Sequence, residues 1–211
     1  MIADRHVALP RDARPPAWAD ALLRRLLEPA DRESLSGDLL EEYREAIVPA
    51  RGRKADRWYV WQVAGFLWRA SWMWGVIVGA TVVIRYLSDT LAPVTYTPDV
   101  IHVRSQLMSN ALMAIFALAA LHAVWRTRHV RAGLLVAVAS SVIGGVISIA
   151  GTGLMLAVWH DPATLRAWQT SGGLGEALYG VPLLLLPIGA ITGTAGAIVG
   201  KGLAWSRRRT V

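Results

Sequence analysis

The sequence contains no cysteine and only two phenylalanines, although hydrophobic residues make up 54% of its 211 residues. Without cysteine the chain has no disulfide, no thiolate nucleophile and no Cys-ligated zinc or iron–sulfur site. Tryptophan, by contrast, occurs ten times, mostly near the ends of apolar runs. Indole rings prefer the headgroup region of a membrane, so this distribution indicates a lipid environment rather than a soluble core.

Catalytic signatures are also lacking. The sequence has no HExxH, GxSxG or P-loop motif and no glycine fingerprint between a strand and a helix. Its five histidines are scattered, so no metal cluster is predicted, and we interpret His122 as an interfacial histidine rather than a proton relay or metal ligand. We therefore expect a protein that is not an enzyme and that holds no cofactor.

The net charge of +7 is unevenly distributed along the chain. Residues 1–50 carry seven arginines and ten acidic residues, a net charge of −3, which is unlike a nucleic-acid-binding face. Residues 51–69 carry five basic residues and one acid, a net charge of +4. We expect no nucleic-acid partner, and we expect this basic segment to contact phospholipid headgroups.

Four apolar runs each approach the roughly 20 residues that a helix needs to cross a bilayer. They lie near residues 70–87, 107–125, 133–159 and 177–200. The sequence therefore predicts an all-α protein, with a small cytoplasmic helical module followed by a four-helix transmembrane bundle at residues 70–205.

Lysine and arginine fix the predicted orientation. Nineteen of them fall on one side of the predicted spans, and the other side has only Arg85, Arg104 and Arg166. Basic segments stay in the cytoplasm, so both termini are predicted to be cytoplasmic.

Residues 1–50 predict a helical hairpin, with helices over 16–28 and 31–48 that each carry an apolar stripe. Asp31 is the expected N-cap of the second helix, and Gly37 within it predicts close packing or a bend. Because the hairpin has too few residues to form a robust core alone, it is expected to dock on the membrane, on a third helix or on a partner.

The second of these helices has an acidic side. Asp38, Glu41, Glu42 and Glu45 follow helical spacing with no histidine among them, which favours a solvated or docking surface over a di-metal site. We predict a protein partner that binds through residues 15–50, and the predicted docking residues are Asp38, Glu41, Glu42 and Tyr43.

Residues 51–69 mix cations with aromatic rings, a pattern typical of an interfacial helix that continues into the first span. The rings are expected at the acyl boundary and the cations near phosphate. The predicted membrane-interface residues are Arg53, Lys54, Arg57, Trp58, Tyr59 and Trp61.

Small residues recur at helical spacing in the last two spans and predict helix-packing faces. The residues concerned are Gly189, Gly193, Gly196 and Gly200 in the last span, with Ser141, Gly145 and Ser148 in the third. We interpret them as packing of the third helix on the fourth. A homo- or hetero-oligomeric interface and a lined pore are the alternatives.

The N-terminal quarter contains PPxWAxxLL at residues 15–23, DRE at 31–33, GDLLEEYR at 37–44 and RWYxxQ at 57–62. Together these segments resemble the permease prefix domain, the N-terminal module of bacterial duplicated orphan permeases that are similar to ABC-type macrolide exporter subunits. The rest of the chain is too short for the extracytoplasmic domain and duplicated core of those permeases. The resemblance implies a standalone bacterial membrane protein that carries the prefix module, and it transfers neither export activity nor a catalytic residue.

Two functions fit these observations. The first is a membrane-anchored interaction or regulatory module of the bacterial cytoplasmic membrane, associated with a transport system. The alternative is a small oligomeric transporter or channel subunit, which would need a polar path through the membrane.

Overall fold

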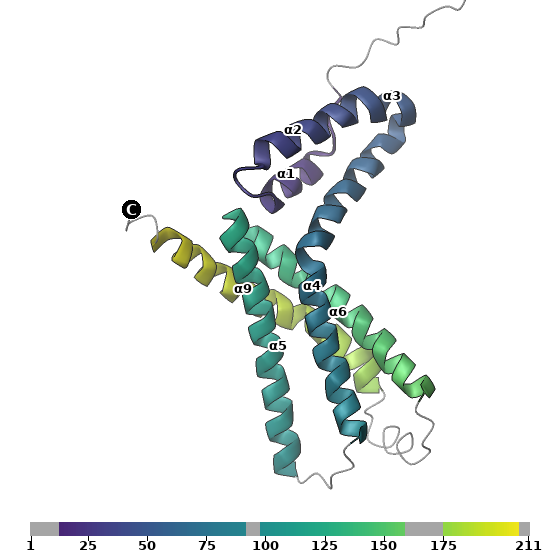
Figure 1. The fold of residues 1–211 in the computed structure, drawn as a ribbon, viewed down its shortest axis with the longest axis vertical. Helices are drawn as coiled ribbons and strands as arrows, with labels where there is room; N and C mark the ends of the chain where they lie inside the picture. Colours follow the sequence, from purple (N-terminus) through teal and green to yellow (C-terminus); the bar gives the residue numbers. More distant parts are fainter. Residues whose placement is uncertain (1–12, 92–97, 159–174, 207–211) are drawn as a thin grey trace, which may run out of the picture. The chain divides into compact units, whose positions relative to one another are not determined.

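The computed structural model describes residues 13–91, 98–158 and 175–206, and every regular element in those ranges is helical (Figure 1). The chain divides into two compact units, Met1–Leu67 and Trp68–Val211. Several sequence predictions lie outside the described residues: the end of the third apolar run at residue 159, the side chain of Arg53, and the basic residues Arg166 and Arg207 to Arg209.

The predicted hairpin helices are present as α1 (Ala17–Leu26) and α2 (Arg32–Glu42). Asp31 precedes α2, but its side chain makes no capping hydrogen bond. The prediction for Gly37 was wrong, because α2 continues through it and a Cβ at this position would meet no atom within 4 Å.

Two π-helical turns precede prolines in the same register. The turn η1 (Tyr43–Ile47) leads through Val48 to Pro49 in α3 (Val48–Arg51), and η3 (Glu176–Gly180) leads through Val181 to Pro182 in α9 (Val181–Ser206). In each turn the valine N–H donates to the carbonyl five residues earlier. A proline lacks an N–H and crowds the carbonyl four residues before it, so a wider turn accommodates it within a continuing helix.

The chain then makes the short 3₁₀ turn η2 (Gly52–Lys54) and enters α4 (Ala55–Leu91). Gly52 has φ +51°, a left-handed conformation that glycine adopts without the steric cost of a Cβ. From Ala55 onward the basic segment continues into the first apolar run as one helix, as the sequence predicts.

The second unit contains the later part of α4 together with α5 (Pro98–Thr127), α6 (Val130–Val158) and α9. Four helical stretches are long and apolar enough to cross a membrane, which confirms the predicted number of spans. They cover Ala55–Ser88, His102–Thr127, Val130–Val158 and Glu176–Leu203.

The second unit buries many small residues between its helices, together with larger ones such as Phe116 and Leu185, and leaves other large apolar side chains exposed. Its buried positions include Ala119, Ala120 and Gly144, whereas Leu107 and Ile191 are about 70% exposed, at 69% and 71%. Small residues between helices and large ones on the outside are typical of helices packed in lipid, where tight van der Waals contact drives association.

Candidate functional site

The N-terminal unit has its own hydrophobic core, drawn from α1, η1 and the first turns of α4. Its buried members are Ala19, Leu23, Leu27, Tyr43, Ala55, Tyr59 and Val63. At its centre the rings of Tyr43 and Tyr59 meet edge to face, with centroids 5.7 Å apart and planes at 82°. Docking on a third helix, one of the predicted ways to stabilise the hairpin, is therefore confirmed.

Two tyrosine hydroxyls tie this core to its rim. The Tyr43 hydroxyl donates to Oδ1 of Asp56 at 2.6 Å, and the Tyr59 hydroxyl donates to Oδ1 of Asp20 at 3.1 Å. Burial, and then the hydrogen bond and negative charge of Asp56, raise the pKa of Tyr43 from 10.0 to about 12. Tyr43 therefore remains a neutral donor at physiological pH.

Two predicted surface residues are thus core residues. Tyr43 was assigned to the docking surface and Tyr59 to the membrane interface, yet they are 4% and 0% exposed. The ring of each packs inward because the apolar stripes of η1 and α4 close over α1. Their role is to hold the unit together.

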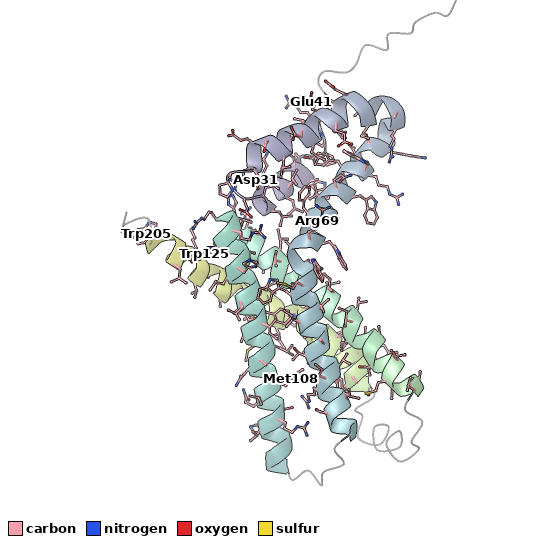
Figure 2. All side chains as sticks on the ribbon, in the orientation of Figure 1. Asp31, Glu41, Arg69, Met108, Trp125 and Trp205 are labelled. Carbon is pink, nitrogen blue, oxygen red and sulfur yellow. The ribbon has the colours of Figure 1, made fainter. Side chains whose placement is uncertain are left out.

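The acidic side of α2 is exposed. Asp38, Glu41 and Glu42 all have exposed side chains, and Glu41 lies on the outer side of α2 in Figure 2. These three residues form what we call the acidic face.

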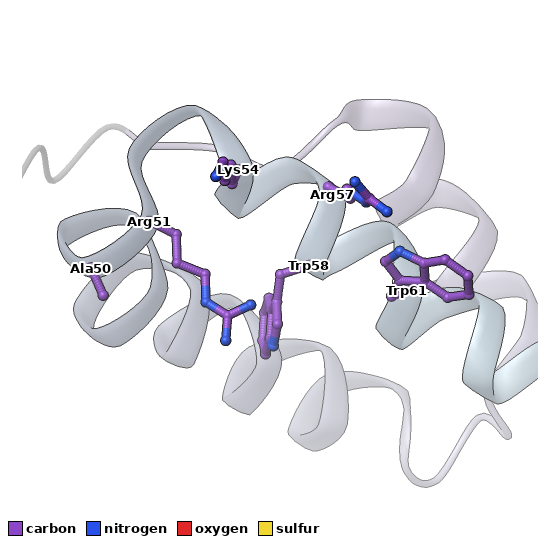
Figure 3. Close-up of a pocket in the computed structure, with 6 residues that line it drawn as sticks. All are labelled: Ala50, Arg51, Lys54, Arg57, Trp58 and Trp61. Carbon is purple, nitrogen blue, oxygen red and sulfur yellow. The ribbon is translucent and has the colours of Figure 1, made fainter.

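A cleft of about 660 Å³ opens between the end of α3 and the start of α4 (Figure 3). We call it the basic-aromatic cleft, and its lining consists of Ala50, Arg51, Lys54, Arg57, Trp58 and Trp61. Figure 3 shows the Arg51 side chain extending toward the ring of Trp58. Four of the predicted membrane-interface residues thus share one cavity.

Local structure explains why these residues converge. Lys54 ends η2, and Arg57, Trp58 and Trp61 of α4 follow it by three, four and seven residues, so the four side chains lie on one side of the helical segment that runs from η2 into α4. The left-handed turn at Gly52 brings Ala50 and Arg51 to the same cleft. The sequence predictions missed Arg51, because its place depends on this turn and not on helical spacing.

The predicted small-residue faces lie between helices of this chain. A Cβ at Gly189 would overlap Ser141 of α6, and a Cβ at Gly193 would overlap Ala137 of α6. At Gly196 it would overlap the backbone of Ala117 in α5. The same face of α9 thus packs on α6 at its first two glycines and on α5 further along. Gly200 extends the contact with α5, where a Cβ would lie 3.3 Å from Leu121.

On α6, Ser141 and Ser148 are buried, and a Cβ at Gly145 would lie 3.7 Å from Pro182 of α9. Helix α6 also contacts α4. The side chains of Ile143 and Ile147 pack against Gly75 and Gly79, respectively. In the same contact, Ser140 Oγ donates to the carbonyl of Ser71 at 3.2 Å. Sequence reasoning missed this pair, although Gly75 and Gly79 form a recognisable GxxxG spacing.

The second unit also contains a cavity that the sequence analysis missed. It has a volume of about 140 Å³, and its lining includes Arg85 and Tyr86 of α4, Ser105 and Ser109 of α5, and Glu176. The remainder is apolar, from residues such as Leu185. Arg85 lies at the end of the first apolar run and Glu176 at the start of the fourth, and these two runs become neighbours only in the folded chain.

Within the described ranges, no group of three His, Asp or Glu side chains is placed to hold a metal ion. Besides the acidic face, the basic-aromatic cleft and the cavity with Arg85 and Glu176 both bring charged side chains together with aromatic or apolar ones. Comparison with protein-family models, with curated proteins and with solved structures finds no match to this chain.

Proposed function

We propose that the chain is a membrane-anchored interaction module of the bacterial cytoplasmic membrane. The N-terminal unit binds a protein partner on the cytoplasmic side, and the four long helices anchor it. The observation that supports this proposal is the arrangement of the N-terminal unit. Its hydrophobic core is completed by the first turns of α4, and the acidic face of α2 remains exposed.

The acidic face selects the chemistry of the partner. Asp38, Glu41 and Glu42 present three carboxylates on little more than one turn of α2. A partner with a basic surface is electrostatically complementary to these carboxylates, and this complementarity raises the rate of association. The resemblance of residues 15–69 to the permease prefix domain supports a partner that belongs to a membrane transport complex.

The alternative function is a small oligomeric transporter or channel subunit. One observation favours it, the cavity that holds Arg85 and Glu176 among apolar residues. Against it, the small-residue faces of α9 and α6 are occupied by helices of the same chain and do not line an opening. Flux of small ions or solutes into vesicles that contain the purified protein tests this alternative.

Affinity purification of the intact chain from its native membrane tests the main proposal. We expect one basic partner in stoichiometric amount, retained by wild type and lost from the Glu41→Gln/Glu42→Gln variant. Glu33→Gln is the matched control, because Glu33 is an exposed carboxylate in the first turn of the same helix. Equal recovery from both variants contradicts docking through the acidic face.

A further inference from the structure

We propose that the basic-aromatic cleft binds the headgroup of one anionic phospholipid, with the phosphate held by Arg51, Lys54 and Arg57. This goes beyond membrane anchoring in general, because it assigns a discrete site that saturates with one lipid per chain. It is also independent of the proposed protein partner, whose acidic face lies on α2.

The charges of the cleft support an anion. Three cations line it, and none of the described residues in its lining carries a carboxylate. The nearest acid in sequence, Asp56, is exposed, accepts the hydrogen bond of Tyr43 at 2.6 Å and does not line the cleft. Guanidinium groups pair with phosphate oxygens through two parallel hydrogen bonds, and lysine adds a compact charge.

The tryptophans and the continuation of the helix identify the anion as a lipid. Trp58 and Trp61 line the cleft beside the cations, and Trp61 is 65% exposed. Indole rings favour the boundary between headgroups and acyl chains. Both residues lie in the first turns of α4, the helix that continues as the first candidate membrane span. The cleft therefore lies on the helix that leads into the first candidate span.

The size of the cleft favours a discrete site over diffuse attraction. A volume of about 660 Å³ falls within the roughly 300–1,000 Å³ of small-molecule pockets and accommodates a glycerophosphate headgroup. A diffuse basic surface, by contrast, attracts anionic lipids without a defined stoichiometry.

Titration of the detergent-solubilised full chain with dioctanoyl phosphatidylglycerol, followed by native mass spectrometry, tests the site. We expect saturation at one lipid per chain and weaker binding of dioctanoyl phosphatidylcholine. Inorganic phosphate should not displace the lipid. Displacement by inorganic phosphate, or equal binding of the two lipids, overturns the assignment.

Matched variants on α4 distinguish the site from overall charge. Arg57→Gln should weaken phosphatidylglycerol binding about fivefold, and Arg69→Gln should leave it unchanged because Arg69 is exposed outside the cleft. Trp61→Ala should weaken binding, whereas Trp68→Ala should not. Lys54→Arg keeps the charge, and its retained binding shows that a substitution in the cleft leaves the fold intact. Equal losses for Arg57→Gln and Arg69→Gln contradict a discrete site.

Discussion

The hydroxyl of Tyr43 in η1 donates a 2.6 Å hydrogen bond to the carboxylate of Asp56 in the first turn of α4. This bond joins the hairpin to the helix that becomes the first candidate span. Tyr43 directly follows the acidic face in sequence, and Asp56 lies among the residues 50–61 that contain the lining of the basic-aromatic cleft. The hairpin that bears the acidic face and the helix that bears the cleft are thus joined through one buried tyrosine.

Replacing Tyr43 by phenylalanine should destabilise the N-terminal unit by about 1 kcal/mol, because Asp56 loses a donor while the ring contact with Tyr59 is kept. Chemical denaturation of the intact protein in detergent, followed by proteolysis within residues 13–67, measures this change. Tyr179→Phe is the control, since Tyr179 is 69% exposed. A Tyr43→Phe protein as resistant as wild type would refute the structural role of this bond.

Stability of the N-terminal unit should fall at alkaline pH. The pKa of Tyr43 is raised in the folded chain to about 12, so the unfolded chain, with a pKa of 10.0, ionises first. The contribution of Tyr43 is therefore complete below about pH 10 and is lost as pH rises toward 12. Denaturation midpoints measured across this window should decline more steeply for wild type than for Tyr43→Phe, and parallel declines would count against the prediction.

Two glycines of the N-terminal unit should respond to alanine in opposite directions. Gly37→Ala should stabilise α2 by roughly 0.5–1 kcal/mol, because glycine is a poor helix former and the position has room for a Cβ. Gly52→Ala should destabilise by about 1 kcal/mol or more, because φ is +51° there. Both are measured by chemical denaturation, and the same sign for the two variants would contradict the backbone described here.

The contact of α9 with α5 should be sensitive at Gly196. Alanine there would overlap the backbone of Ala117, so the two helices must separate, at a cost of about 2 kcal/mol. Gly202→Ala on the same helix meets no atom within 4 Å and serves as the control. Thermal unfolding in detergent, followed by circular dichroism, should show a lower midpoint for Gly196→Ala alone.

The sequence could predict the spans and the small-residue faces, because run length and helical spacing are local properties. Spacing places Gly189 and Gly196 on one face of a helix, but it does not reveal that the first meets α6 and the second α5. Which elements become neighbours is a property of the whole fold.

The candidate sites show the same limit. The basic and aromatic character around Lys54 and Trp61 was readable from the sequence, whereas the contribution of Arg51 depends on the left-handed turn at Gly52. An aromatic ring amid charged residues looks like a surface residue, and only the packing of α1 and α4 shows that Tyr59 is buried. The cavity with Arg85 and Glu176 joins segments some 90 residues apart, beyond the reach of any local pattern.

The absence of cysteine allows the proposed membrane topology to be tested directly, since any introduced cysteine is the only thiol in the chain. The exposed positions Glu33, His102 and Arg128 are suitable for single substitutions to cysteine. With a membrane-impermeant maleimide on intact bacterial cells, we predict labelling of His102→Cys alone, with Glu33→Cys and Arg128→Cys labelled only after permeabilisation. Labelling of Glu33→Cys in intact cells would place the N-terminal unit outside the cell and contradict the account.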